Sequence, residues 1–103
     1  ATTPGAISYV GFSYVDHTVQ SITLNNVAPT DANVVTNRWP IWSYEHMYTG
    51  KRPNALTKQF IKYIQAPHIQ TTLVHQLGYI GMSEMHITRD VDGTVKQVGD
   101  AHE

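Results

Sequence analysis

The stretch from Trp39 to Tyr48 constrains the fold most, because it has the pattern of the longest strand in the chain. Side chains of a strand point alternately to its two faces. The even-numbered face carries Trp42, Tyr44, His46 and Tyr48, and the odd-numbered face carries Ile41, Ser43, Glu45 and Met47. Both faces are partly apolar, so we expect this strand to be covered on both sides, as strands are in α/β proteins.

Shorter strands and a turn are predicted before this stretch. Residues 6–10 and 19–24 are rich in apolar and β-branched side chains, as short strands are. The pair Asn25-Asn26 marks a turn, because asparagine tolerates left-handed backbone angles. Strands therefore precede the long strand.

Two helices and a hairpin are predicted after the long strand at residues 39–48. Asn54 is suited to cap a helix that runs to about Gln65, and Pro67 is suited to begin a second one that Gly78 ends. Residues 85–89 and 94–98 flank the pair Asp92-Gly93, which is a hairpin signal. Strands, adjacent helices and a terminal hairpin together indicate an α/β fold.

Composition narrows the class of protein. The chain has 103 residues, enough for one small domain, and its net charge is −1, with no basic patch that could bind nucleic acid. It has no cysteine, which excludes disulfides and thiolate metal sites. No apolar run approaches the ~18 residues of a membrane span. Because neither a signal peptide nor an initiator Met is present, we interpret the chain as mature, processed or cut from something larger.

Catalytic and metal-binding residues are not expected. The histidines are scattered, and no H-E-x-x-H run places two of them on one helical turn. No serine lies in a G-x-S-x-G turn, so no nucleophile is indicated. We therefore predict a protein that is not an enzyme and that has no metal and no cofactor.

The strongest local candidate for anion binding is the loop at residues 49–54. Lys51 and Arg52 bring positive charge to the start of the helix that Asn54 caps, and backbone N–H groups at a helix start attract anions. A solvated loop with two basic residues is the simpler interpretation, and we favour it. The many aromatic side chains fit core packing better than a sugar-binding or stacking surface.

Several segments match motifs of one known family in the same order. Residues 4–11 (PGAISYVG) are similar to a "GAIGYV" strand, and residues 39–49 (WPIWSYEHMYT) to a long "YPI-rich" strand. A helix at residues 56–64 follows, and Leu77-Gly78-Tyr79-Ile80 is similar to a "GY-x-P" element, with Gly81 where Pro is common. Across roughly residues 4–98 the chain resembles the phosphate ABC-transporter substrate-binding proteins, in their Gram-positive form.

The resemblance implies a fold. It would be the C-terminal portion of a two-lobed type II periplasmic-binding architecture, a mixed sheet with helices packed on it. Residues 1–103 would form a single C-terminal fragment. About residues 1–38 would resemble part of the second lobe, and about residues 39–103 the segment that returns to the first lobe.

The resemblance also implies a function and a location. Members of this family are extracytoplasmic components of ABC importers that hold inorganic phosphate and dock on a membrane permease. In Gram-positive cells they are extracellular, cell-surface lipoproteins anchored through an N-terminal cysteine, which this chain lacks.

One departure from the family pattern affects the expected site. The family grips phosphate with Thr/Ser-containing turns, an Asp, and an Arg followed by a Ser-Gly-Thr run, all before the "GAIGYV" strand. None of these motifs occurs in the chain, so no phosphate ligand transfers to it. These residues are therefore expected to be mainly scaffold.

An alternative is an independent self-associating or protein-interaction module that binds no ligand. If the chain is a fragment of such a binding protein, residues 41–48 would lack the strands that normally cover their apolar faces. Exposed apolar patches drive association, so we expect a homodimer or a strand-exchanged oligomer.

Overall fold

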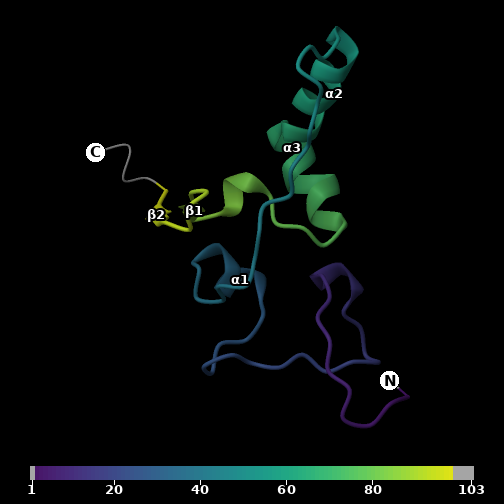
Figure 1. The fold of residues 1–103 in the computed structure, drawn as a ribbon, viewed down its shortest axis with the longest axis vertical. Helices are drawn as coiled ribbons and strands as arrows, with labels where there is room; N and C mark the ends of the chain where they lie inside the picture. Colours follow the sequence, from purple (N-terminus) through teal and green to yellow (C-terminus); the bar gives the residue numbers. More distant parts are fainter. Residues whose placement is uncertain (1, 99–103) are drawn as a thin grey trace.

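The computed structural model describes residues 2–98 and contains short helices and one hairpin (Figure 1). In chain order the elements are η1 (Phe12–Tyr14), α1 (Asp31–Val35), α2 (Ala55–Gln65), α3 (Pro67–Ile69), η2 (Gln70–Val74), η3 (Met82–Glu84), β1 (Ile87–Arg89) and β2 (Val95–Gln97). Here η1 and η3 are single 3-10 turns, and η2 is a π-helical turn that continues α3.

The predicted hairpin is confirmed. Strands β1 and β2 pair antiparallel with Thr88 opposite Lys96. Gly93 takes a φ of 90°, which favours glycine, and the Thr94 amide donates to Asp92 Oδ1 at 2.9 Å. The turn residues therefore set this register by local interactions.

The predicted helices are also confirmed, because local caps fix their ends. Asn54 Oδ1 accepts a hydrogen bond from the Thr57 amide at 2.8 Å and caps α2. The helix that starts at Pro67 ends before Gly78, whose φ is 87°. Gln70 then joins the two ends of this region, since its side chain donates to the Ile64 carbonyl and accepts from the Met82 amide.

The predicted mixed sheet is not found within residues 2–98, where the sheet has two strands, both from the hairpin. Residues 39–48 contain no strand, because no neighbouring segment pairs with their backbone. Residues 6–10 likewise form no strand, and residues 19–24 contribute only the bridge Leu24–Val27, which closes the predicted turn at Asn25-Asn26. A strand needs a hydrogen-bonded partner, and residues 2–98 supply none at these places.

The expectation that the long strand is covered on both faces is also wrong for residues 2–98. Ile41 is 67% exposed and Tyr48 is 87% exposed. The alternation itself is correct, since Trp42, Tyr44, His46 and Tyr48 form one row of neighbouring rings, with centroids 5.1 to 6.5 Å apart. The sequence pattern therefore predicted the faces but not their surroundings.

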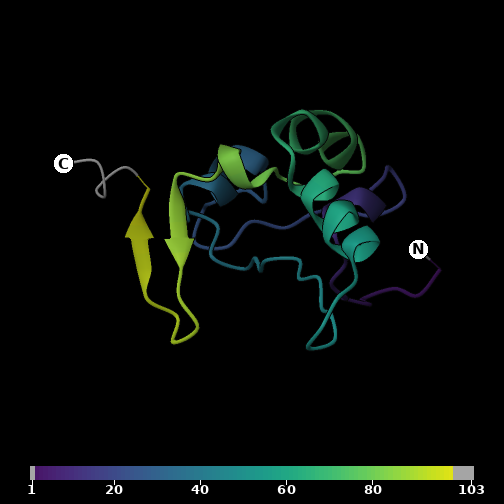
Figure 2. The ribbon, with the colours of Figure 1, turned by 90° about the horizontal axis from the view of Figure 1, so that it is seen from above.

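The buried core is small. Val34, Met85 and Ile87 form its centre, between α1 and β1. Figure 2 shows the hairpin and α2 on opposite sides of the molecule. The accessible surface is 8853 Å², whereas a compact chain of this mass exposes about 5,800 Å². The radius of gyration is 16.8 Å, against about 13 Å for a compact domain. Most apolar side chains outside the α1–β1 contact therefore remain unburied.

Candidate functional site

The most organised polar cluster surrounds the guanidinium group of Arg89. Its Nη1 donates to the Trp42 carbonyl at 2.7 Å, and its Nη2 donates to the Pro40 carbonyl at 3.0 Å and to Asn37 Oδ1 at 3.2 Å. The same group stacks on the indole of Trp42, with Cζ 3.9 Å from the ring centroid. One planar side chain thus joins β1 to residues 37–42.

Neighbouring contacts hold this cluster in place. Asn37 has a φ of 61° where the chain turns after α1, and its Oδ1 also accepts from Trp42 Nε1 at 2.8 Å. The Tyr44 hydroxyl accepts from the Arg89 amide at 3.0 Å, and the His86 amide donates to the Val35 carbonyl at 3.0 Å. The end of α1, the extended segment and β1 are therefore fastened together.

The hydrogen bonds of this cluster hold the protein chain together. The acceptors around Arg89 are carbonyl and amide oxygens, and no acidic side chain within residues 2–98 forms an ion pair with it. Its donors point at the protein, so they position the extended segment. No local signal in the sequence identified Arg89, because its partners lie 45 to 52 residues away.

The loop predicted as a candidate anion site lies on the surface. Lys51, Arg52 and Asn54 are all exposed, and the structure brings them together at the bend before α2. Asn54 Oδ1 already accepts from the Thr57 amide, so the asparagine satisfies a helix N–H that an anion would otherwise meet. Lys51 and Arg52 form no ion pair within residues 2–98. Anion binding here stays a prediction.

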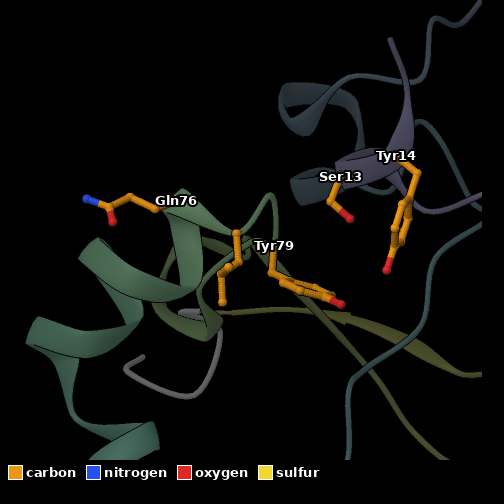
Figure 3. A pocket seen from close by; sticks show the side chains of 5 residues that line it. Ser13, Tyr14, Gln76 and Tyr79 are labelled. Atoms are coloured by element: carbon orange, nitrogen blue, oxygen red, sulfur yellow. The ribbon is translucent and has the colours of Figure 1, made fainter.

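An open depression of about 460 Å³ lies where the N-terminal segment approaches the end of the second helix. Its lining residues are Ser13, Tyr14, Gln76, Leu77 and Tyr79. Figure 3 shows Ser13 and Tyr14 facing the ring of Tyr79, while Gln76 points away. None of these side chains is charged, so the depression lacks a cation to balance a phosphate. No pattern in the sequence predicted this depression, because residues far apart in the chain form it.

Ionisable side chains elsewhere form local pairs. His75 Nδ1 lies 3.7 Å from Glu84 Oε1, and Lys96 Nζ lies 3.1 Å from Asp90 Oδ2. The hydroxyl and amide of Thr18 donate to Asp16 and hold the pKa of its carboxyl below the ordinary value. Among the described residues, no three His, Asp or Glu side chains converge as metal ligands would. His102 lies outside the described residues.

No helix of residues 2–98 has both the length and the apolar character needed to cross a membrane. The described residues include surface loops, an uncharged depression and a structural arginine cluster.

Comparison with known proteins gives one informative match. No protein-family model matches the chain. The chain is 42% identical, over 94 residues, to the phosphate-binding protein PstS of Bacillus subtilis. The match covers 90% of this chain but only 31% of the Bacillus protein. It confirms the resemblance to phosphate-binding proteins seen in the motifs, and the chain corresponds to about a third of such a protein. Helices with a small antiparallel sheet are compatible with a fragment of an α/β fold.

Proposed function

We propose that the chain is the C-terminal portion of the solute-binding component of an ABC importer for inorganic phosphate. Within that protein, these residues supply scaffold and not phosphate ligands. The observation that carries the proposal is the 42% identity to a phosphate-binding protein over 90% of the chain. The ordered motifs from residue 4 to residue 81 point to the same family.

The described contacts and the sequence support the proposed scaffold role. No Ser-Gly-Thr run is present, and the best-ordered polar cluster, around Arg89, is turned inward on the protein. The small core and the large accessible surface are those expected of a segment that completes its packing against other parts of a longer protein. Residues 39–48, extended and without a partner strand, fit a strand that joins a larger sheet.

The remaining features of the proposal come from the family. The complete protein would have two lobes of the type II periplasmic-binding architecture. Residues 1–38 would belong to the second lobe, and residues 39–103 would return to the first. The complete protein would deliver phosphate to a membrane permease and would catalyse no reaction. It would act outside the cell as an anchored lipoprotein. The comparisons give no support to an independent interaction module.

A chimera tests this proposal. The matching region of the Bacillus phosphate-binding protein is replaced by the corresponding residues of this chain, and phosphate binding is measured by calorimetry. If these residues are scaffold for such a protein, the chimera binds phosphate within about tenfold of the parent, which corresponds to about 1.4 kcal/mol.

A second chimera carrying Arg89→Ala serves as control. It is expected to unfold at lower denaturant concentration, since the carbonyls of Pro40 and Trp42 lose their donor. A chimera that unfolds cooperatively and yet binds no phosphate contradicts the proposal.

A further inference from the structure

The turn between β1 and β2 contains a pair of residues that can react with each other. Asp92 is the only aspartate of the chain that a glycine follows. Because glycine has no Cβ, nothing shields the Gly93 nitrogen from the carboxyl group of Asp92, and the backbone at this point is free to rotate once released. Both residues are exposed, and Figure 2 shows the loop between β1 and β2 projecting away from the helices. Water therefore reaches this pair.

The folded turn engages both reacting groups in other contacts. The Gly93 amide donates to the Asp90 carbonyl at 2.9 Å, and Asp92 Oδ1 accepts from the Thr94 amide at 2.9 Å. Attack by the Gly93 nitrogen needs its N–H released and the carboxyl protonated, since a carboxylate is a poor electrophile. The amide and hydroxyl of Thr94 instead hold the pKa of Asp92 below its ordinary value, which keeps the carboxyl ionised. The fold therefore opposes the reaction at both partners.

We propose that Asp92-Gly93 is a modification site that rearranges to isoaspartate when the hairpin turn opens, and that the folded turn suppresses this reaction. The Gly93 nitrogen bonds to Cγ of Asp92, and the carboxyl hydroxyl leaves with the amide proton as water. Water then opens the resulting five-membered succinimide ring. Opening at Cγ restores aspartate, and opening at the main-chain carbonyl gives isoaspartate. One water is released and one is taken up, so no other reactant is needed.

Isoaspartate at this place would disrupt the hairpin. It inserts one more carbon atom into the main chain of a turn whose ends are joined by the Asp90 amide and the Thr94 carbonyl at 2.8 Å. The lengthened turn no longer matches the register in which Ile87 lies opposite Gln97. Ile87 is 1% exposed and belongs to the small core, so the change reaches the core. These contacts are made by residues 85–98 and α1, so the inference does not depend on the proposed role in phosphate uptake.

The chain contains a matched aspartate that lacks the glycine. Asp16 Oδ1 accepts from the Thr18 amide at 2.8 Å, as Asp92 does from Thr94, and Asp16 is also exposed. The residue after Asp16 is His17, whose side chain crowds the backbone nitrogen that would attack the carboxyl. Asp16 therefore serves as an internal control that has the same carboxylate contact and a hindered nucleophile.

Ageing of the 103-residue chain tests the proposal. The chain and a synthetic peptide of residues 89–97, too short to hold a stable hairpin, are kept in the same neutral buffer. Trypsin then cuts after Arg89 and Lys96 and gives the same fragment from both. Chromatography against a synthetic isoaspartate standard measures the modified fraction. The peptide should form isoaspartate about tenfold faster than the chain or more, because the turn of the chain must open first.

Two variants separate the contribution of Thr94. Thr94→Ala removes the hydroxyl contact with Asp92, so isoaspartate at Asp92 should form about twofold faster or more. Thr18→Ala makes the same change beside Asp16 and should leave the rate at Asp92 as in the wild type. Equal rates in the peptide and the chain overturn the protection by the fold. Equal amounts of isoaspartate at Asp16 and Asp92 of the urea-unfolded chain overturn the site, and a Thr94→Ala rate equal to the wild type overturns the contribution of the Thr94 hydroxyl.

Discussion

Arg89 shows how one side chain can fasten segments that are distant in the sequence. Its guanidinium donates to two carbonyls and an amide oxygen, and it stacks on Trp42. A planar, permanently charged fork is needed for all of these contacts at once. At the residue scale, the position of the extended segment depends on this side chain more than on any local propensity.

Arg89→Lys should therefore destabilise the chain. Lysine keeps the charge but loses the fork and the stacking, so the free energy of unfolding should fall by about 1–3 kcal/mol. Urea unfolding followed by tryptophan fluorescence measures this directly, since Trp42 lies under the guanidinium group. Arg38→Lys is the control, because Arg38 is exposed. An equal midpoint for both variants would refute the role of Arg89.

Gly78 carries two separate constraints. Its φ is 87°, and a Cβ built there would lie 2.9 Å from Ser13 Cβ. Gly5 has a similar φ of 76° but open space around it. Gly78→Ala should lower the free energy of unfolding by about 1–3 kcal/mol, and Gly5→Ala by less, because only Gly78 adds a collision to the backbone strain. Thermal unfolding of both variants separates the two costs. Equal losses would show that the Ser13 contact carries no energy.

At the scale of elements, the helices and the hairpin could be predicted from the sequence, because local capping and turn residues set them. Helix α2 begins where Asn54 caps it, and the hairpin turns at Asp92-Gly93. The mixed sheet could not be, because residues 39–48 have a strand pattern whose partners are absent from residues 2–98. The same difference applies to the sites. The loop of Lys51 and Arg52 was recognisable from the sequence, whereas the Arg89 cluster depends on contacts across 45 or more residues.

The hairpin turn should respond to acid. The amide and hydroxyl of Thr94 hold the pKa of Asp92 below its ordinary value in the folded chain. When the pKa of a carboxyl is lower in the folded chain than in the unfolded chain, the carboxylate stabilises the fold at pH values above its unfolded pKa. That stabilisation is lost as the pH falls through the folded pKa. Carboxyl chemical shifts of Asp92 should therefore titrate at lower pH in the folded chain than in urea. Titration at the same pH in both states would rule out this hydrogen bond.

At the scale of the whole molecule, the accessible surface and the identity to a phosphate-binding protein lead to the same view. The chain exposes about one and a half times the surface of a compact domain of its mass, and it matches 31% of the Bacillus protein. Both findings fit a scaffold segment whose packing is completed by other residues. The resemblance to phosphate-binding proteins was readable from ordered motifs, but ligand residues were not, because none of that family's phosphate-binding motifs occurs in the chain.

We propose that these residues support phosphate binding in a longer protein without providing the phosphate ligands. The most direct test is calorimetric titration of the 103-residue chain with inorganic phosphate, with the Bacillus phosphate-binding protein titrated in the same buffer as positive control. We expect no saturable binding of phosphate by the chain up to about 1 mM. Saturable binding by the chain alone with a micromolar Kd would contradict it.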